Sequence, residues 1–167
     1  MKRLVLLLLS LCLHLGAKEK PVETFAALNW GEPVEGAAKT EVKAEDHQGK
    51  IVVVEEFGVR IPDCIKRLKD LGQLQKRVER EKLPIVIYAI HRQREVPDDE
   101  IVKAIKDARA EAITIRKNGW LPTFGEGMPR AGIFLPDGTQ LWHGPSNERE
   151  FDRSLKDALK AVSEKQE

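Results

Sequence analysis

The sequence predicts an α/β fold, a three-layer sandwich in which helices flank a mixed central sheet. Two unbroken apolar runs, residues 51–54 and 85–90, have the composition of strands that are buried on both faces. A stretch with apolar residues at helical spacing separates them, and this order of strand, helix and strand predicts parallel pairing. A Pro-Asp-Gly-Thr turn at residues 136–139 then predicts an antiparallel hairpin, which makes the sheet mixed.

The first 17 residues have the pattern of a signal peptide. Lys2 and Arg3 precede an apolar run over residues 4–15, and the small residues Gly16 and Ala17 follow it. The run is shorter than the roughly 20 apolar residues that a membrane-spanning helix needs. We therefore expect cleavage after Ala17, export to the periplasm or the cell exterior, and no membrane contact after cleavage.

Charge and cysteine content narrow the classes of function. The chain has 28 basic and 27 acidic residues, interspersed along its length, so no basic surplus favours nucleic acid as a partner. Cys12 makes a lipoprotein the alternative, although Leu11 stands where a lipid-attachment site has a small residue. Once the signal peptide is removed, Cys64 is alone and cannot form an internal disulfide.

Three segments follow the signal peptide. Residues 18–48 contain several glycines and prolines and are expected to form an extended lead-in. Residues 49–163 are expected to form one domain, which is long enough to bury a core of its own. Residues 164–167 are left as a C-terminal tail.

Strands and helices alternate in the first part of the domain. A strand at residues 51–57 is followed by a helix from about residue 62 to 80, with apolar residues at helical spacing. The apolar run at residues 85–90 predicts the next strand. Pro97 and two aspartates after it predict the start of a helix that ends near Ala108.

The last third of the domain has a different pattern. A short strand at residues 113–115 is expected before a loop rich in glycine and proline. Strands at residues 131–135 and 140–143 are expected to pair across the hairpin turn. Ser146 or Asn147 is expected to cap a final helix that covers one face of the sheet.

Three stretches carry a resemblance to a known family. Residues 49–57 are a Gly-Lys pair and an apolar strand that ends in phenylalanine. Residues 127–138 read Gly-Met-Pro-Arg-Ala-Gly-Ile-Phe-Leu-Pro-Asp-Gly, and residues 142–144 read Trp-His-Gly. In this order they resemble the thioredoxin-like superfamily, in its secreted, TlpA-like or redoxin-like branch. The resemblance covers nearly all of residues 49–163 and implies a thioredoxin-like fold.

The chain departs from that family at the catalytic motif. The family has an aromatic-small-x-x-C-x-x-C segment after the phenylalanine, whereas Phe57 is followed here by Gly-Val-Arg-Ile-Pro-Asp-Cys, which is one residue shorter. Aligning Cys64 with the second family cysteine places Ile61 at the position of the attacking cysteine, with Pro62 next to it. Thiol-disulfide exchange needs both sulfurs, so this incomplete motif is not expected to support it.

Three roles are open for Cys64. It lies on the apolar stripe of its helix with Leu68 and Leu71, which is typical of a small buried core residue. A reactive single thiol would instead form mixed disulfides or a sulfenic acid, and a disulfide between two copies is the third role. The adjacent charge of Asp63 opposes formation of the thiolate.

Two further site residues follow from the resemblance. Glu56 matches the buried acid that accepts a proton from the second cysteine, whereas an ion pair with Lys or Arg near the sheet edge is the alternative. Since Glu55 and Glu56 are neighbours in a strand, only one of them can face the helix that carries Cys64. Pro129 matches the family's cis proline, and Met128 matches the residue before it; in the family both line a substrate groove. A trans proline that starts an edge strand is the alternative for Pro129.

Metals and cofactors are not expected. His47, His91 and His143 are far apart and lack the spacing of a metal site.

The function that follows is an exported thioredoxin-like protein without dithiol oxidoreductase activity. Its expected partners are extended protein or peptide segments, thiol-containing proteins among them, bound in a groove formed by Ile61, Pro62, Met128 and Pro129. The alternative is a monothiol redox protein that acts through Cys64, with Glu56 as its base. If the protein is an enzyme, it is expected to be a thiol-dependent oxidoreductase.

Overall fold

The computed structural model describes residue 25 and residues 28–121 and 127–164. The predicted signal peptide, the start of the lead-in and most of the tail therefore lie outside the described residues.

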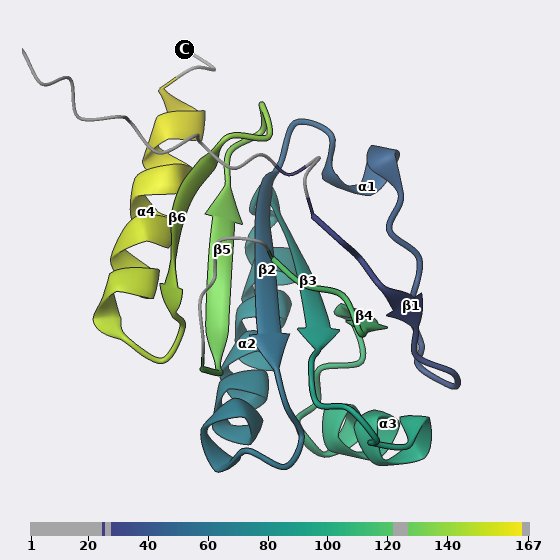
Figure 1. The fold of residues 1–167 in the computed structure, drawn as a ribbon. Coiled ribbons are helices and arrows are strands. Elements are labelled where there is room, and N and C mark those ends of the chain that lie inside the picture. Colours follow the sequence, from purple (N-terminus) through teal and green to yellow (C-terminus); the bar gives the residue numbers. More distant parts are fainter. Residues whose placement is uncertain (1–24, 26–27, 122–126, 165–167) are drawn as a thin grey trace, which may run out of the picture.

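The described residues form one six-stranded sheet with the strand order β1-β4-β3-β2-β5-β6 (Figure 1). The strands are β1 (Glu32–Pro33), β2 (Ile51–Phe57), β3 (Ile85–His91), β4 (Thr114–Lys117), β5 (Arg130–Phe134) and β6 (Gln140–Pro145). The helices are α1 (Ala44–His47), α2 (Pro62–Glu81), α3 (Asp98–Asp107) and α4 (Arg149–Ser163).

The sheet is mixed, which confirms the predicted fold class. The β2 strand pairs in parallel with β3, and β3 pairs in parallel with β4. On its other side β2 is antiparallel to β5, which continues into β6 through a hairpin. In the hairpin turn Gly138 has a φ of +84°, a conformation that glycine adopts without steric cost.

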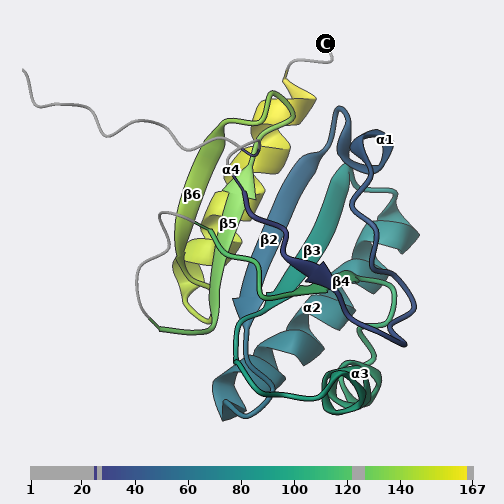
Figure 2. The same cartoon turned by 45° about the vertical axis from the view of Figure 1, so that its right-hand side comes forward.

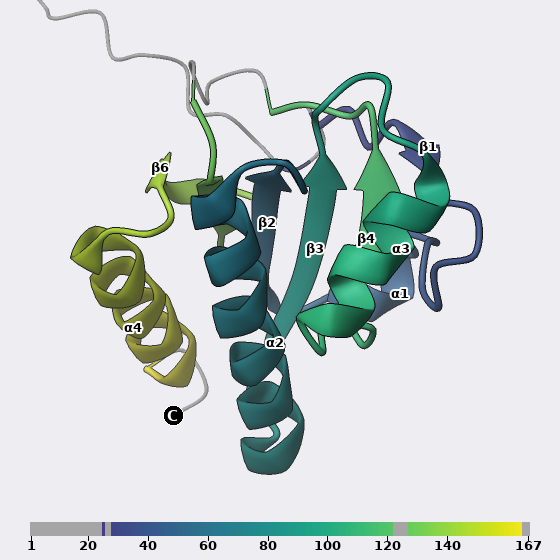
Figure 3. The same cartoon turned by 90° about the horizontal axis from the view of Figure 1, so that it is seen from below.

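The two faces of the sheet are covered differently. The helices α2, α3 and α4 all lie on one side, as Figures 2 and 3 show. Their apolar residues form a cluster with the sheet residues beneath them, among which are Ile51, Val53 and Phe57 of β2; we call it the helix-face cluster. On the opposite face Val52 and Val54 belong to a second cluster, onto which Trp30 of the lead-in packs; we call it the lead-in-face cluster.

Helix α2 follows from its sequence. Pro62 occupies the first turn, where its missing N–H removes no helical hydrogen bond. The residues Cys64, Leu68 and Leu71 recur at helical spacing and are fully buried in the helix-face cluster. The helix ends at Glu81, and the next residue, Lys82, caps it in the left-handed conformation with a φ of 51°.

One arginine joins the lead-in to the sheet. Arg116 of β4 donates from Nε to the carbonyl of Trp30, from Nη1 to that of Thr40 and from Nη2 to that of Gly31, at 3.2, 2.8 and 2.6 Å. These bonds connect residues 76 to 86 positions apart in the chain, so they fix residues 30–40 of the lead-in to the sheet.

The predicted cap of the last helix was wrong. Helix α4 starts at Arg149, and its N-cap residue Glu148 makes no side-chain cap hydrogen bond. The hydroxyl of Ser146 instead donates to the buried carboxylate of Glu55 in β2. The bond that the hydroxyl donates to this buried carboxylate is stronger than the bond that it would accept from a backbone amide at the exposed start of the helix.

Candidate functional site

The candidate site lies at the end of the sheet where β2 finishes and β5 begins. Glu56 pairs in register with Arg130, so Pro129, one residue earlier, lies beside the loop that follows Phe57. That loop, residues 58–61, leads directly into α2. The topology thus brings to one end of the sheet the predicted groove residues Ile61, Pro62, Met128 and Pro129.

Cys64 lies in the first turn of α2 and is fully buried as a free thiol. The pKa of Cys64 is raised to about 11, chiefly by burial and to a smaller extent by the charges of Glu55 and Asp63, while a hydrogen bond with the backbone of Gly58 opposes the shift. The thiolate is therefore a minor species at neutral pH, and the sulfur is not exposed to a partner.

Ile61 is the residue immediately before α2. Its backbone is extended, with φ −113° and ψ 114°, and its carbonyl accepts the first helical hydrogen bond from the amide of Ile65 at 3.2 Å. The side chain is half-buried against the helix-face cluster. A hydrocarbon thus occupies the position that the resemblance assigns to an attacking cysteine.

Met128 and Pro129 lie directly before β5. The peptide bond between them is cis. Met128 is half-buried against the helix-face cluster, and the carbonyl of the buried Pro129 accepts a hydrogen bond from the amide of Ser146 at 3.3 Å. Ile61 and Met128 therefore pack on the same apolar cluster from two chain segments, and each keeps part of its surface exposed.

Glu56 does not face Cys64. Its carboxylate accepts a hydrogen bond from Arg92 Nη1 at 2.6 Å and another from the amide of Leu121 at 2.9 Å. Leu121 belongs to the lead-in-face cluster, on the side of the sheet away from α2. Of the two alternatives for Glu56, the structure therefore contains the ion pair, and the carboxylate lies on the face of the sheet away from Cys64.

Glu55 is the acid on the face that carries Cys64. It is fully buried, receives a hydrogen bond from Arg67 Nε of α2 at 3.2 Å and receives another from the Ser146 hydroxyl. Burial raises the pKa of Glu55 to about 7, although the charge of Arg67 and both hydrogen bonds lower it. Glu55, Arg67 and Ser146 thus connect β2, α2 and the segment between β6 and α4.

Small neighbours make room for this buried group. In register, Glu55 lies between Ala89 of β3 and Ala131 of β5, and Ala131 pairs with Gly144 of β6. The sequence reasoning missed Glu55 because it relied on position relative to Phe57. Strand alternation from Phe57, a core residue, would have placed Glu55 on the same face.

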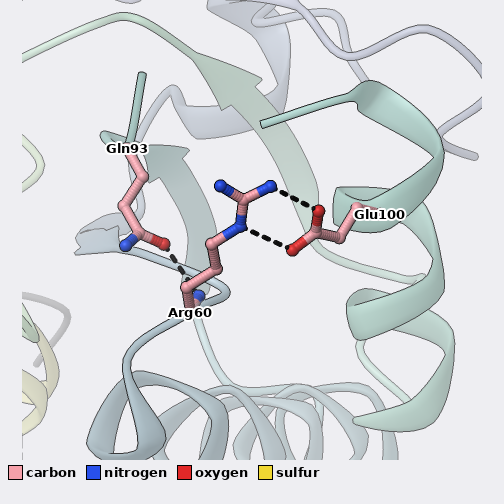
Figure 4. Close-up of polar contacts among 3 residues, drawn as sticks. All are labelled: Arg60, Gln93 and Glu100. Atoms are coloured by element: carbon pink, nitrogen blue, oxygen red, sulfur yellow. Dashed lines mark hydrogen bonds and ion pairs between the residues drawn. The ribbon is translucent and has the colours of Figure 1, made fainter. Parts of the chain in front are cut away.

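Polar contacts fix the loop before α2 to its neighbours (Figure 4). Arg60 donates from Nε and Nη2 to the two carboxylate oxygens of Glu100 in α3, at 3.0 and 2.8 Å. Its backbone amide donates to the side-chain oxygen of Gln93 at 2.8 Å. A Cβ added at Gly58 would lie 2.6 Å from the Gln93 side chain, so the loop and Gln93 are in close contact.

The described residues contain no cluster that suits a metal. No group of three or more His, Cys, Asp or Glu side chains within residues 28–121 and 127–164 could hold an ion. His91 is buried, and burial lowers its pKa to about 4, so the ring is neutral at pH 7. Over the same stretches, no helix has the length and apolar character required to cross a membrane.

Several solved structures have a similar architecture. A thiol:disulfide interchange protein of the thioredoxin family from Chlorobium tepidum superposes with a TM-score of 0.59 at 19% identity, over 84% of this chain and 99% of that one. A thiol-disulfide isomerase from Corynebacterium glutamicum gives 0.59 at 18% identity, over 83% and 96%. The exposed lipoprotein thioredoxin of Streptococcus pneumoniae gives 0.60 at 15% identity, over 81% and 99%.

Sequence comparison adds nothing to this, since no protein-family model and no curated protein matches the chain. At these identities the structural matches establish the architecture and not the chemistry. Each of the three structures superposes over more than four fifths of this chain. The chain therefore has the thioredoxin-like fold.

Proposed function

We propose that this chain is an exported thioredoxin-fold protein that has lost dithiol oxidoreductase activity and binds extended segments of other proteins. The binding surface is formed by Ile61, Pro62, Met128 and Pro129, which we call the groove surface. The observation that carries the proposal is a combination of two facts. Ile61 is the residue before α2, and the thiol of Cys64 in the first turn of α2 is completely buried.

The chemistry of the site supports the loss of activity. Dithiol exchange requires one thiolate to attack a disulfide and a second cysteine to resolve the mixed disulfide. The hydrocarbon side chain of Ile61 can do neither. Cys64 has a pKa of about 11 and no exposed surface, so it cannot substitute for the missing nucleophile.

The groove surface supports a binding role. Pro62 is exposed, and Ile61 and Met128 are partly exposed while resting on the helix-face cluster. An apolar surface anchored in this way is preorganised, which lowers the entropic cost of binding an unfolded segment. In the family that the sequence resembles, the residues matching Met128 and Pro129 contact an extended substrate through their backbone.

A monothiol mechanism through Cys64 is less well supported. Formation of a mixed disulfide or a sulfenic acid requires an accessible sulfur with a lowered pKa. Cys64 has the opposite properties, and Glu56, its proposed base, is bonded to Arg92 on the other face of the sheet. Reaction of the native thiol with a disulfide reagent in the absence of denaturant would revive this mechanism.

Export rests on the N-terminal pattern of the sequence. Two basic residues, an apolar run and Gly16-Ala17 predict cleavage after Ala17. The similar pneumococcal protein is described as an exposed lipoprotein, and a similar disulfide oxidoreductase from Mycobacterium tuberculosis is described as secreted. The intact mass of the protein recovered from an exporting cell tests the cleavage position.

Two assays test the proposed function. In insulin-disulfide reduction, the protein and its Cys64→Ala variant should both match the blank; activity in the wild type alone would remove the proposal. For binding, we choose carboxymethylated insulin B chain, a segment without free thiols, and fluorescence anisotropy. Met128→Lys should weaken binding at least tenfold, whereas Leu141→Lys, a change at an exposed apolar residue of β6, should not. Equal affinity of both variants would exclude the groove surface.

A further inference from the structure

A hollow lies beside the start of β3, at the end of the sheet opposite to the groove surface. The β4 strand is short and pairs with β3 only from Tyr88 onward, so residues 85–87 have no strand beside them on that side (Figure 1). These residues line a hollow of about 520 Å³ together with residues 38–41 of the lead-in and with Ala112 and Thr114, where the chain enters β4. We call it the edge hollow.

The edge hollow reaches the backbone of β3. The side chains of Ile85 and Ile87 belong to the helix-face cluster, whereas that of Val86 packs against the lead-in-face cluster. A space that all three residues line therefore runs along the edge between the two faces, where a strand displays its backbone groups.

The backbone groups of β3 alternate between its two neighbours. In a parallel sheet the amide and carbonyl of one residue point to one side, and those of the next residue point to the other. The amide of Arg92 donates to the carbonyl of Phe57 in β2 at 2.9 Å, so the even-numbered residues of β3 face β2. The carbonyl of His91 accepts from the amide of Asn118, just after β4, at 3.0 Å, so the odd-numbered residues face the side of β4 and the edge hollow.

Two backbone groups on this edge lack a partner. The amide of Ile85 donates to the carbonyl of Leu83 at 2.8 Å, and the ladder with β4 begins at the carbonyl of Ile87. The carbonyl of Ile85 and the amide of Ile87 remain, and no residue that the structure describes forms a hydrogen bond with either. In a parallel pairing one residue of an added strand donates to the first group and accepts from the second, so this edge offers the bonds for an added strand.

The edge hollow is closed at the end next to β4. The chain passes Ala112 and Thr114 as it enters β4, in line with any strand that would lie beside residues 85–87. An added strand cannot continue past this point beside β3, so its inner end is a chain terminus. That terminus is a carboxylate if the strand runs parallel to β3, and an ammonium group if the strand is antiparallel.

A lysine lies at the closed end. The carbonyl of Lys39 accepts from the amide of Ile115 in β4 at 2.9 Å, which places Lys39 beside the start of β4. Lys39 is exposed, lines the hollow and forms no ion pair with any residue that the structure describes. The acid nearest to it in the sequence, Glu41, is paired with Lys43 at 3.0 Å. The closed end thus carries a positive charge, which attracts a carboxylate and repels an ammonium group.

We propose that the edge hollow binds the carboxy-terminal residues of another protein, which add to β3 as a short parallel strand with their carboxylate at Lys39. The volume suits a chain end and not a folded domain. Asp46, the other acid of the hollow, lies toward its open end, because its carbonyl accepts from Lys50 beside the start of β2. The site lies apart from the groove surface, needs no thiol chemistry and does not depend on the proposed function.

The experiment is a set of NMR titrations of the protein with three probes. Acetyl-Ala-Val-Ala with a free carboxylate is the ligand probe, the same peptide with a C-terminal amide lacks only the charge, and acetate lacks the strand. The free acid should give saturable shifts at the amides of Ile87 and Ile115 and should slow hydrogen exchange at Ile87. The amidated peptide should bind at least threefold more weakly, and acetate at least tenfold more weakly.

Three results would overturn the proposal. The first is the absence of saturable shifts at Ile87 with the free acid, and the second is equal affinity of either control probe. The third is a set of saturable shifts at Ile61 and Met128 alone, because the peptide would then occupy the groove surface; the proposed function would stand in that case.

One variant tests the position of the carboxylate. Lys39→Gln changes an exposed side chain and keeps the backbone bond to Ile115, so the fold should be unchanged. In this variant the free acid should bind about as weakly as the amidated peptide. Lys156→Gln removes the same charge from an exposed position of α4, over the other edge of the sheet, and should keep the difference between the two peptides. If Lys39→Gln prefers the free acid as strongly as the wild type does, the carboxylate does not lie at Lys39 and the proposal fails.

Discussion

Glu55 and Glu56 are neighbours in β2, yet their carboxylates lie on opposite faces of the sheet and have different partners. Glu55 bonds to Arg67 and Ser146 under the helices, and Glu56 bonds to Arg92 and the amide of Leu121 under the lead-in. Strand alternation separates the two charges. The chain thereby keeps a buried acid beside Cys64 without any accessible thiol for that acid to activate.

The buried Glu55 should make stability depend on pH. Its pKa is raised from 4.5 to about 7 by burial, so between these values the folded protein holds a proton that the unfolded chain has released. The stabilisation from this proton is complete below pH 4.5 and is lost as pH rises through 7. Relative to Glu55→Gln, the wild type should lose on the order of 3 kcal/mol of unfolding free energy across that window.

Urea unfolding at half-unit steps from pH 4.5 to 8.5 measures this difference. Glu79→Gln, at an exposed position of α2, is the matched control for removal of one carboxylate. A wild type that gains stability relative to Glu55→Gln as pH rises would show that the attraction of Arg67 outweighs burial.

The lead-in should depend on Arg116. Replacing it by Met keeps the length of the side chain but removes the donors to the carbonyls of Trp30, Gly31 and Thr40. We expect a loss of about 1 to 3 kcal/mol, because charged donors bind strongly and the freed carbonyls are only partly rehydrated. Hydrogen exchange should accelerate across residues 28–42 while β2 and β3 stay protected. Arg153→Met, at an exposed site of α4, should have neither effect; uniform acceleration in Arg116→Met would indicate general unfolding instead.

The sequence predicts the strands and helices better than the contacts between them. The apolar runs that form β2 and β3, and the helical spacing that forms α2, depend on neighbouring residues and were confirmed. The sequence left open which of Glu55 and Glu56 faces the helices, because residues 51–54 are all apolar and such a run does not reveal which residues lie on the helix side.

Contacts between residues that are far apart in the sequence were also missed, because local patterns carry no information about them. Ser146 looked like a helix cap because capping depends on local sequence, but its acceptor Glu55 lies 91 residues earlier in the chain. The lead-in appeared extended, and the bonds that fix it come from Arg116, which no local pattern marks. Where the fold supplies a stronger distant partner, a local preference does not decide the contact.

The Arg60 to Glu100 pair should control the mobility of the loop before α2 more than global stability. The two side chains are 52% and 40% exposed, so Glu100→Gln should cost less than about 1 kcal/mol in unfolding. Because the pair holds residues 58–61 against α3, amide exchange at Arg60 and Ile61 should still increase severalfold. Hydrogen exchange with residue resolution measures this increase. Swapping the two charges in the double variant Arg60→Glu/Glu100→Arg should restore the protection of both amides. A swapped variant as mobile as Glu100→Gln would mean that the ion pair does not hold the loop.

Ile61→Cys tests whether the scaffold retains the geometry of the missing chemistry. The substitution creates Cys-Pro-Asp-Cys at the start of α2, where the turn brings positions 61 and 64 together and the helix end favours a thiolate. We expect mild oxidation to remove two hydrogens from the intact mass, both thiols to be protected from alkylation, and insulin reduction to rise above the wild-type blank. Val59→Cys introduces a cysteine in the same loop without the C-x-x-C spacing and should do none of this. If Ile61→Cys stays a dithiol under the same oxidation, Ile61 does not occupy the position of the attacking cysteine, and the alignment through Cys64 is wrong.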